Sequence, residues 1–273
     1  PACEYPYPSF AFAWQNLLSA IQISERISPV PSSLPVTPKP YNMRTLNGDL
    51  LPWRLKPRPI PMPEVSSVAI NLKRICDSSV HAASWKVFFC GAQPLSLPEH
   101  STQIIELVAD VHSTAFVRWK FKASEKSQIR LKVTYSEGYE LEPRSYPFFR
   151  TKKDRLDANN GHILGPFDEV TLDIADGGTV TYEPFWFRTF RIMQVEITAL
   201  SAPVDLISLE ATQVNYPMAV KARWSEPGDE HNENIWDVSI RTMRNCMFDG
   251  YSDCPFYEQL QCVYSSNASQ PVH

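Results

Sequence analysis

The segment SDCPFYEQLQ, residues 252–261, holds the side chains of this sequence that are best suited to chemistry. Asp253 and Glu258 are two carboxyl groups on either side of a Cys254–Pro255 pair, with aromatic residues between them. Aromatic neighbours remove water from a carboxyl group, which raises its pKa and keeps it protonated as a general acid. Taken alone, the spacing favours a structural interpretation, in which Asp253 caps a helix and Glu258 is a solvated charge in the first turn.

Pro255 predicts the backbone around these two carboxyl groups. Proline disfavours the α conformation for the residue before it, so a helix that precedes Cys254 must end there. The chain must then turn before it can resume a helix near Tyr257. We therefore expect Asp253 at a turn between two helices, and Glu258 in the first turn of the second helix.

Residues 229–248, just before this turn, have the periodicity of an amphipathic helix. Asp229 is the expected N-cap, and acidic residues fill the first turn, where the helix dipole favours anions. The apolar positions of the pattern are Ile235, Trp236, Ile240, Met243 and Met247. We expect one helix of about four turns. It needs packing partners, because an isolated helix of this length is marginal in water.

Residues 66–216 alternate between apolar and polar side chains, as half-buried strands do. In QIRLKVTY, residues 128–135, every second residue is apolar. Further strands are predicted at residues 104–109, 115–121, 169–174, 187–197 and 205–212. Turn signals such as Asp176–Gly178 separate them, and no convincing helix lies between them. The fold class is therefore mainly β, an antiparallel β-sandwich.

Residues 1–65 are a proline-rich segment and connector, in which much of the chain's total of 24 prolines falls. Proline fixes φ and removes a backbone donor, so these stretches predict extended connections rather than sheet or helix interior. Residues 12–27 form one candidate short helix within the segment.

Composition excludes several classes of function. The net charge is −4, and lysine and arginine are scattered among acidic residues, so we expect no nucleic-acid partner. The longest apolar runs are far shorter than a membrane span, so we expect no membrane partner. Six cysteines without a CxxC pair give no support to a zinc site, and we expect no cofactor. No signal peptide is visible, which leaves the compartment open and favours the cytoplasm slightly.

The aromatic-rich stretch FWFRTFRI, residues 185–192, allows two interpretations. Trp186, Arg188, Phe190 and Arg191 could form a sugar-binding platform, since an aromatic face and a guanidinium suit a carbohydrate ring. The favoured alternative places Phe185, Phe187 and Ile192 in the core and pairs the arginines with acids such as Glu183 and Glu196. The histidines, among them His112, have no partner in a recognisable motif and are interpreted as structural.

Several motifs in register resemble the α-L-rhamnosidases of glycoside hydrolase family 78. The resemblance is carried by FDGYSDCPFYEQLQ (248–261), LLPWRLKPRPIPMPE (50–64), the Y-x-E-x-Y of residues 135–139, YEPFWFRTFRIMQVEI (182–197) and NIWDVSIRTMRNCMFD (234–249). It covers roughly residues 42–261. It implies β-sandwich domains followed by an (α/α)6 barrel, whose start would be residues 217–273.

The resemblance also implies roles for individual residues. Asp253 would contact the rhamnose and Glu258 would serve as the general acid of an inverting hydrolysis of terminal α-L-rhamnose. Tyr257 and Trp186 join Asp253 as predicted substrate-binding residues. The partner implied is a rhamnose-containing carbohydrate.

Inverting hydrolysis also needs a second carboxylate, as base, roughly 6.5–9.5 Å from the acid. In the family this base comes from further along the barrel. After Gln261 the chain reads CVYSSNASQPVH, which departs from the family pattern. We therefore expect a truncated barrel and an incomplete, inactive enzyme. The alternative is a non-catalytic carbohydrate-binding or structural β-sandwich.

Overall fold

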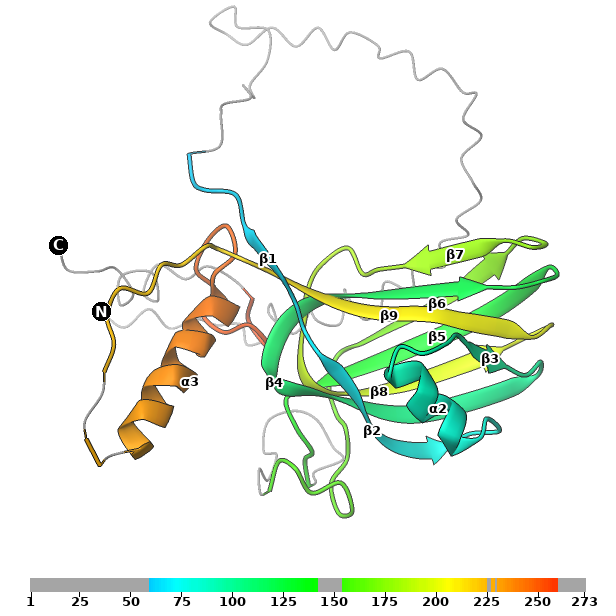
Figure 1. Cartoon of the computed structure of the whole chain (residues 1–273), viewed down its shortest axis with the longest axis horizontal. Coiled ribbons are helices and arrows are strands. Elements are labelled where there is room, and N and C mark those ends of the chain that lie inside the picture. The colour runs from blue at the N-terminus through cyan, green and yellow to red at the C-terminus, as the bar shows by residue number, and fades with distance from the viewer. Residues whose placement is uncertain (1–58, 142–153, 225–226, 229, 260–273) are drawn as a thin grey trace, which may run out of the picture.

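A computed structural model describes residues 59–141, 154–224, 227–228 and 230–259. Nine strands and two helices lie in this part of the chain (Figure 1). They are β1 (Glu64–Ser67), β2 (Ile70–Asp77), α2 (Ala82–Phe89), β3 (Leu95–Leu97), β4 (Ser101–Lys122), β5 (Ser127–Ser136), β6 (Phe167–Ile174), β7 (Thr179–Tyr182), β8 (Arg188–Ala199), β9 (Val204–Asn215) and α3 (Glu230–Cys246). The candidate helix at 12–27 and the predicted N-cap Asp229 lie outside the described residues.

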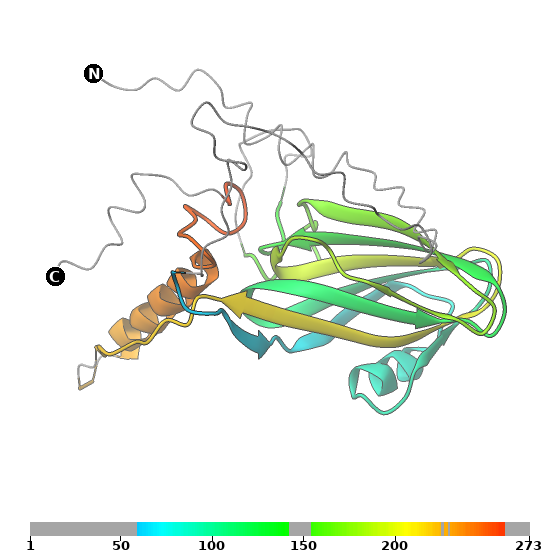
Figure 2. The same ribbon diagram turned by 90° about the horizontal axis from the view of Figure 1, so that it is seen from above.

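The strands form an antiparallel sheet that folds over into two layers, as Figure 2 shows. The long strand β4 belongs to both layers. Its first part pairs with β2 and β8, and the sheet continues through β5 to β6. Its last part pairs with β9 and β7. The register with β8 shifts between Val108 and Ser113, and this irregularity marks the bend.

The prediction of a mainly β fold with antiparallel strands is confirmed. All six predicted strands are present, but those at 104–109 and 115–121 are two parts of the single strand β4. In β5 the residues Ile129, Leu131 and Val133 are buried, and Arg130 between them is exposed. This alternation follows from the period of two in the sequence, because successive side chains of a strand point to opposite faces. The turn signal at Asp176–Gly178 is also correct, since Gly177 adopts a positive φ of 64° between β6 and β7.

The core lies between the two layers and is closed at one side by α2. Trp85 of α2 and Trp119 of β4 are both fully buried. The indole N–H of Trp85 donates to Ser78 Oγ at 3.0 Å. The sequence pattern did not predict α2, β1, β2, β3 or β7. These elements are short, and α2 buries two aromatic side chains of an apolar run that has no clear helical stripe.

The helix predicted at 229–248 is confirmed as α3, but much of its apolar stripe is uncovered by the described residues. Ile235 is 51% exposed, and Met243 is also exposed. Trp236 and Ile240 are half-buried. No second helix begins in the described residues up to Gln259, where residues 255–258 form a turn instead. Neither α2 nor α3 is long and apolar enough to cross a membrane.

Candidate functional site

The candidate site is the segment 247–259, which follows α3 and folds back on the sandwich. Met247 and Tyr251 form an antiparallel bridge. The backbone N–H of Ser252 donates to Cys246 O at 2.8 Å, so the chain reverses direction directly after the helix. This tight reversal brings Asp253 and the residues after it against the start of β8.

Polar side chains of the sandwich fix the end of α3. Asn215 Nδ2 donates to the carbonyls of Arg244 at 2.6 Å and Met247 at 3.2 Å. Asn245 Nδ2 donates to His112 O at 2.8 Å, and Gln213 Nε2 donates to Asn245 Oδ1 at 2.7 Å. The last carbonyls of a helix have no partner within the helix, so the contact from Asn215 satisfies Arg244 O, and the other contacts join the end of α3 to the sandwich.

A second set of contacts holds the Cys-Pro turn. Thr189 Oγ1 donates to Pro255 O at 2.5 Å, and Phe256 is buried. Phe256 lies next to Gly165, where a side chain is excluded because a Cβ atom would stand 1.8 Å from Tyr135 O. The Phe256 ring lies beside this close approach, with its Cζ 3.4 Å from where that Cβ atom would stand.

Trp186 anchors the far end of the segment. Its Nε1 donates to Gln259 Oε1 at 3.0 Å, and its ring packs against Phe187 and Phe248 with centroids 4.9 and 5.8 Å apart. The indole is 37% exposed. The structure thus brings Trp186 and the segment of Asp253 and Glu258 together, although more than sixty residues separate them in the sequence.

The two carboxyl groups lie on the exposed side of this segment. Asp253 and Glu258 are both exposed, and Tyr257 beside them is 37% exposed. The described residues therefore do not enclose Glu258 in aromatic side chains, and the expected desolvation is not found in this part of the chain.

Cys254 makes capping contacts within the turn. The Cys254 thiol donates to Glu258 Oε2 at 2.5 Å, and Cys254 Sγ accepts the backbone N–H groups of Tyr257 and Glu258 at 3.3 Å each. Burial, followed by the hydrogen bond to Glu258, raises the pKa of the Cys254 thiol. The thiol therefore remains a donor near neutral pH and holds one oxygen of Glu258.

Both interpretations of FWFRTFRI need correction. Phe190 is fully buried and cannot contribute to a platform, whereas Phe185, expected in the core, is 97% exposed. Phe187 is buried as the alternative predicted. Arg188 pairs with Asp168 through both carboxylate oxygens, so the prediction of an acidic partner was right in kind but wrong in residue. Glu183 and Glu196 pair instead with Arg118 and Lys132.

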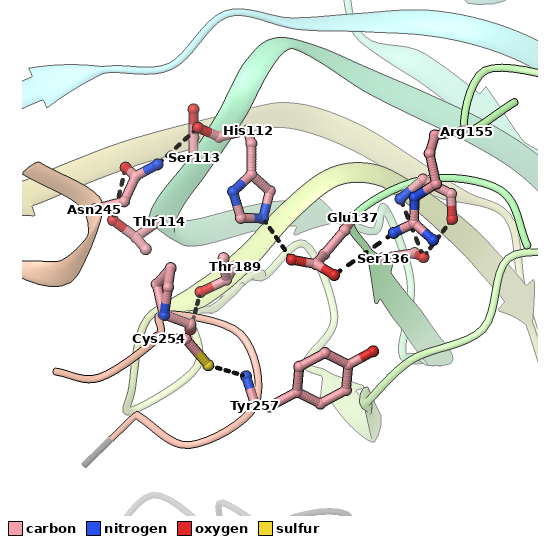
Figure 3. A network of polar contacts seen from close by, with 12 residues as sticks. His112, Ser113, Thr114, Ser136, Glu137, Arg155, Thr189, Asn245, Cys254 and Tyr257 are labelled. Carbon is pink, nitrogen blue, oxygen red and sulfur yellow. Dashed lines mark hydrogen bonds and ion pairs between the residues drawn. The ribbon is translucent and has the colours of Figure 1, made fainter. Parts of the chain in front are cut away.

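A charged network lies next to the segment, at the bend of β4 (Figure 3). His112 Nε2 is 3.8 Å from Glu137 Oε1, and Glu137 Oε2 is 3.5 Å from Arg155 Nη2. Arg155 Nη1 is also 3.0 Å from Oε1 of the buried Glu140. His112 thus has an acidic neighbour that no sequence motif indicated, and its interpretation as a structural histidine stays a prediction. Thr114, two residues after His112, pairs in register with Thr189, the residue that holds Pro255.

The environment of His112 disfavours its charged form. Burial lowers the pKa of His112 below its ordinary value of 6.5, and nearby arginines act in the same direction. Glu137 opposes this shift. The three residues of the Y-x-E-x-Y motif have different surroundings. Tyr135 is buried in the core, and Tyr139 donates to the buried Glu106 at 2.5 Å. Glu137, between them, belongs to the network with His112.

A cavity of about 530 Å³ opens between α3 and the bend of β4. Its walls include Val111, His112, Trp236, Ile240 and Arg241, but neither Asp253 nor Glu258. Within the described ranges, no group of three or more His, Cys, Asp or Glu side chains could hold a metal ion.

The residues that fix the segment were not predicted as such. Thr189, Asn215 and Asn245 are polar residues within regular strand or helix patterns, and nothing in their local sequence indicates long-range hydrogen bonds. Their burial is the only unusual feature, and burial is a property of the fold.

Comparison with known proteins gives limited similarity. No family model matches the chain, and no curated protein matches it. Among solved structures, the chain is similar to a GH78 family rhamnosidase of Bacillus sp. GL1, at 24% identity and a TM-score of 0.41 over 61% of this chain. It is also similar to a rhamnosidase from Klebsiella oxytoca with rhamnose bound, at 16% identity and a TM-score of 0.46 over 72% of this chain. The matches span 16% and 38% of those two chains. At these values neither likeness assigns a function.

Proposed function

We propose that this chain carries the sugar-binding and proton-donating segment of a glycoside hydrolase that resembles the inverting α-L-rhamnosidases. Asp253 is the ligand of a terminal α-L-rhamnose, and Glu258 is the general acid. Tyr257 and Trp186 line the sugar. The observation that carries the proposal is the segment 247–259, which is fixed to the sandwich at Thr189, Trp186 and Asn215 and presents both carboxyl groups on its exposed side.

The hydrogen bond from Cys254 gives the two oxygens of Glu258 different tasks. Oε2 accepts the thiol proton, so the proton for the leaving glycosidic oxygen belongs on Oε1. A general acid must keep its proton until the bond breaks. In the proposed enzyme, closure of the site by a bound sugar and its aglycone supplies the desolvation that the exposed Glu258 lacks.

The described residues supply the donor half of this chemistry. Inversion requires a base across the sugar from the acid. We assign that base to none of the described residues, and neither described cavity includes Glu258. The proposal therefore expects sugar binding without turnover from the 273-residue chain.

Two assays test the proposal. Hydrolysis of an aryl α-L-rhamnoside by the purified chain should not exceed the buffer rate, and clear turnover would contradict the half-site. Calorimetry with L-rhamnose should show binding that Asp253→Ala removes and Glu258→Gln preserves. Binding that Asp253→Ala leaves unchanged would contradict the role of Asp253.

A non-catalytic carbohydrate-binding sandwich is the second candidate. It is favoured by the exposure of Phe185 and the partly exposed Trp186 beside it. An exposed aromatic face suits the apolar side of a sugar ring. Rhamnose binding that survives Asp253→Ala and Glu258→Gln but disappears with Trp186→Ala would support this candidate over the first.

A further inference from the structure

The outer edge of β9 is interrupted between two short strands. At one end Ser67 of β1 pairs with Thr212, and at the other Leu95 of β3 pairs with Leu206. Residues 207–211 between these points have no strand partner on this edge in the described part of the chain. On its other edge β9 remains paired with β4 through this stretch, apart from one register shift, so the open edge has a rigid support.

Backbone polar groups point into the interruption. The N–H of Val68 donates to Ala211 O at 2.9 Å, which shows that the polar groups of Ala211 face this edge. Residues two apart on a strand direct these groups to the same side, so the N–H and C=O of Leu209 face it as well. Among backbone hydrogen bonds that the described residues make outside regular elements, none involves Leu209.

A cavity of about 670 Å³ lies over this edge. The link between β1 and β2, residues 67–70, bounds one end, and residues 91–94 before β3 bound the other. Phe88 and Phe89 of α2 form an apolar wall, and the exposed Glu210 adds a negative charge. Figure 1 shows α2 on this side of the sandwich, away from α3. The cavity shares no lining residue with the candidate sugar site.

We propose that this cavity binds a short extended peptide, which adds to β9 as a strand between β1 and β3. Both flanking strands run antiparallel to β9, so an inserted strand in the same direction continues their ladders. Ala211 O is already bonded to Val68, so the open stretch is residues 207–210, which corresponds to about 13 Å of extended chain at roughly 3.3 Å per residue. Such strand addition takes affinity from main-chain hydrogen bonds and specificity from pockets for alternate side chains.

The lining predicts the peptide's composition. The residue opposite Leu209 exchanges two backbone hydrogen bonds with it, and an apolar side chain there meets the wall of Phe88 and Phe89. A neighbouring lysine or arginine pairs with Glu210. Proline is excluded opposite Leu209, because it has no N–H to donate. This inference does not depend on the proposed sugar chemistry.

Selection from a phage-displayed library of random peptides on the full chain tests the proposal. The enriched peptides should share an apolar residue next to lysine or arginine. A synthetic enriched peptide should lose roughly tenfold in affinity when Ala92→Trp fills the cavity. The matched change Ala175→Trp, at an exposed position of the β6–β7 turn, should leave affinity within about twofold. A library without enrichment, or equal binding by the Ala92→Trp variant, overturns the proposal.

A measurement on the unaltered protein guards against misfolding of the variant. N-methylation of the peptide amide opposite Leu209 should weaken binding roughly tenfold, since it removes a backbone donor. Hydrogen exchange at the Leu209 amide should slow when the unmodified peptide binds. Unchanged affinity for the methylated peptide, or unchanged exchange at Leu209, overturns strand addition.

Discussion

The sandwich and the segment after α3 are stabilised by different kinds of interaction. Within the sandwich, side chains such as Leu131, Trp119 and Ile197 are almost completely buried between two layers. The α3 segment leaves Ile235 half exposed and buries Met247 and Phe256, and hydrogen bonds from Asn215 and Thr189 hold it to the sandwich. Apolar burial is non-directional and broadly distributed, whereas a few hydrogen bonds fix one orientation. We therefore expect the segment after α3 to open at a lower free-energy cost than the sandwich.

The largest effect is expected from the core. Leu131→Ala should lower the free energy of unfolding by about 3 kcal/mol, because it removes buried methyl groups and leaves a cavity. The control Ile235→Ala on α3 should change it by less than about 0.5 kcal/mol. Urea denaturation followed by fluorescence measures both, and similar losses in the two variants would contradict the contrast between the regions.

The second-largest loss of stability is expected from the ion pair of Arg188 and Asp168. Asp168→Ala leaves the largely buried Arg188 guanidinium without its carboxylate, so we expect a loss of about 3 kcal/mol or slightly less. The exposed pair gives the control, because Glu183→Ala beside Arg118 should cost below about 1 kcal/mol. Equal effects in urea denaturation would show that burial does not distinguish these pairs.

The third prediction concerns the hydrogen bond that fixes the Cys-Pro turn. Thr189→Val removes the donor to Pro255 O and should cost about 1 kcal/mol locally. Hydrogen exchange at the amides of Phe256 to Gln259 should accelerate, while the midpoint of global unfolding moves little. Thr171→Val on the exposed face of β6 is the matched control and should change neither quantity. A Thr189→Val variant with unaltered local exchange would show that the turn is held elsewhere.

The smallest effect is a dependence of stability on pH through His112. Because burial lowers the pKa of folded His112, the unfolded state binds more protons as the pH falls below 6.5. Stability from this group is therefore fully present above 6.5 and is lost on acidification toward the lower pKa of the folded state. His112→Gln should flatten this part of the stability profile. If the variant keeps the slope, other groups are responsible.

Local sequence pattern predicted the sandwich well because its cause is local. Alternation in residues 128–135 reflects the two faces of one strand, and the 229–248 periodicity reflects one helix. The pattern did not reveal that β4 is continuous through its bend, because the residues between Ala109 and Ser113 break the alternation. It also missed α2, whose buried Trp85 and Phe88 acquire their role only when two layers close around them.

The residues of the candidate site could be predicted from the sequence, but the contacts that attach the site to the sandwich could not. Asp253 and Glu258 were identified from one short segment and its resemblance to a family. The hydrogen bond from Trp186 to Gln259 spans 73 residues of sequence, and the sequence pattern gives no sign of it. The thiol contact of Cys254 with Glu258 is local, but it depends on the conformation of the turn. Glu137 could have been matched to His112 only by knowing that the ends of β5 and the bend of β4 meet.

The most direct test of the central claim is an amide chemical-shift titration of the 273-residue chain with L-rhamnose. We expect shifts to concentrate at Asp253, Cys254 and Tyr257 and at the indole N–H of Trp186, and we expect Asp253→Ala to abolish them. Shifts confined to other parts of the sandwich, or no shifts at saturating sugar, would contradict a rhamnose site on this segment.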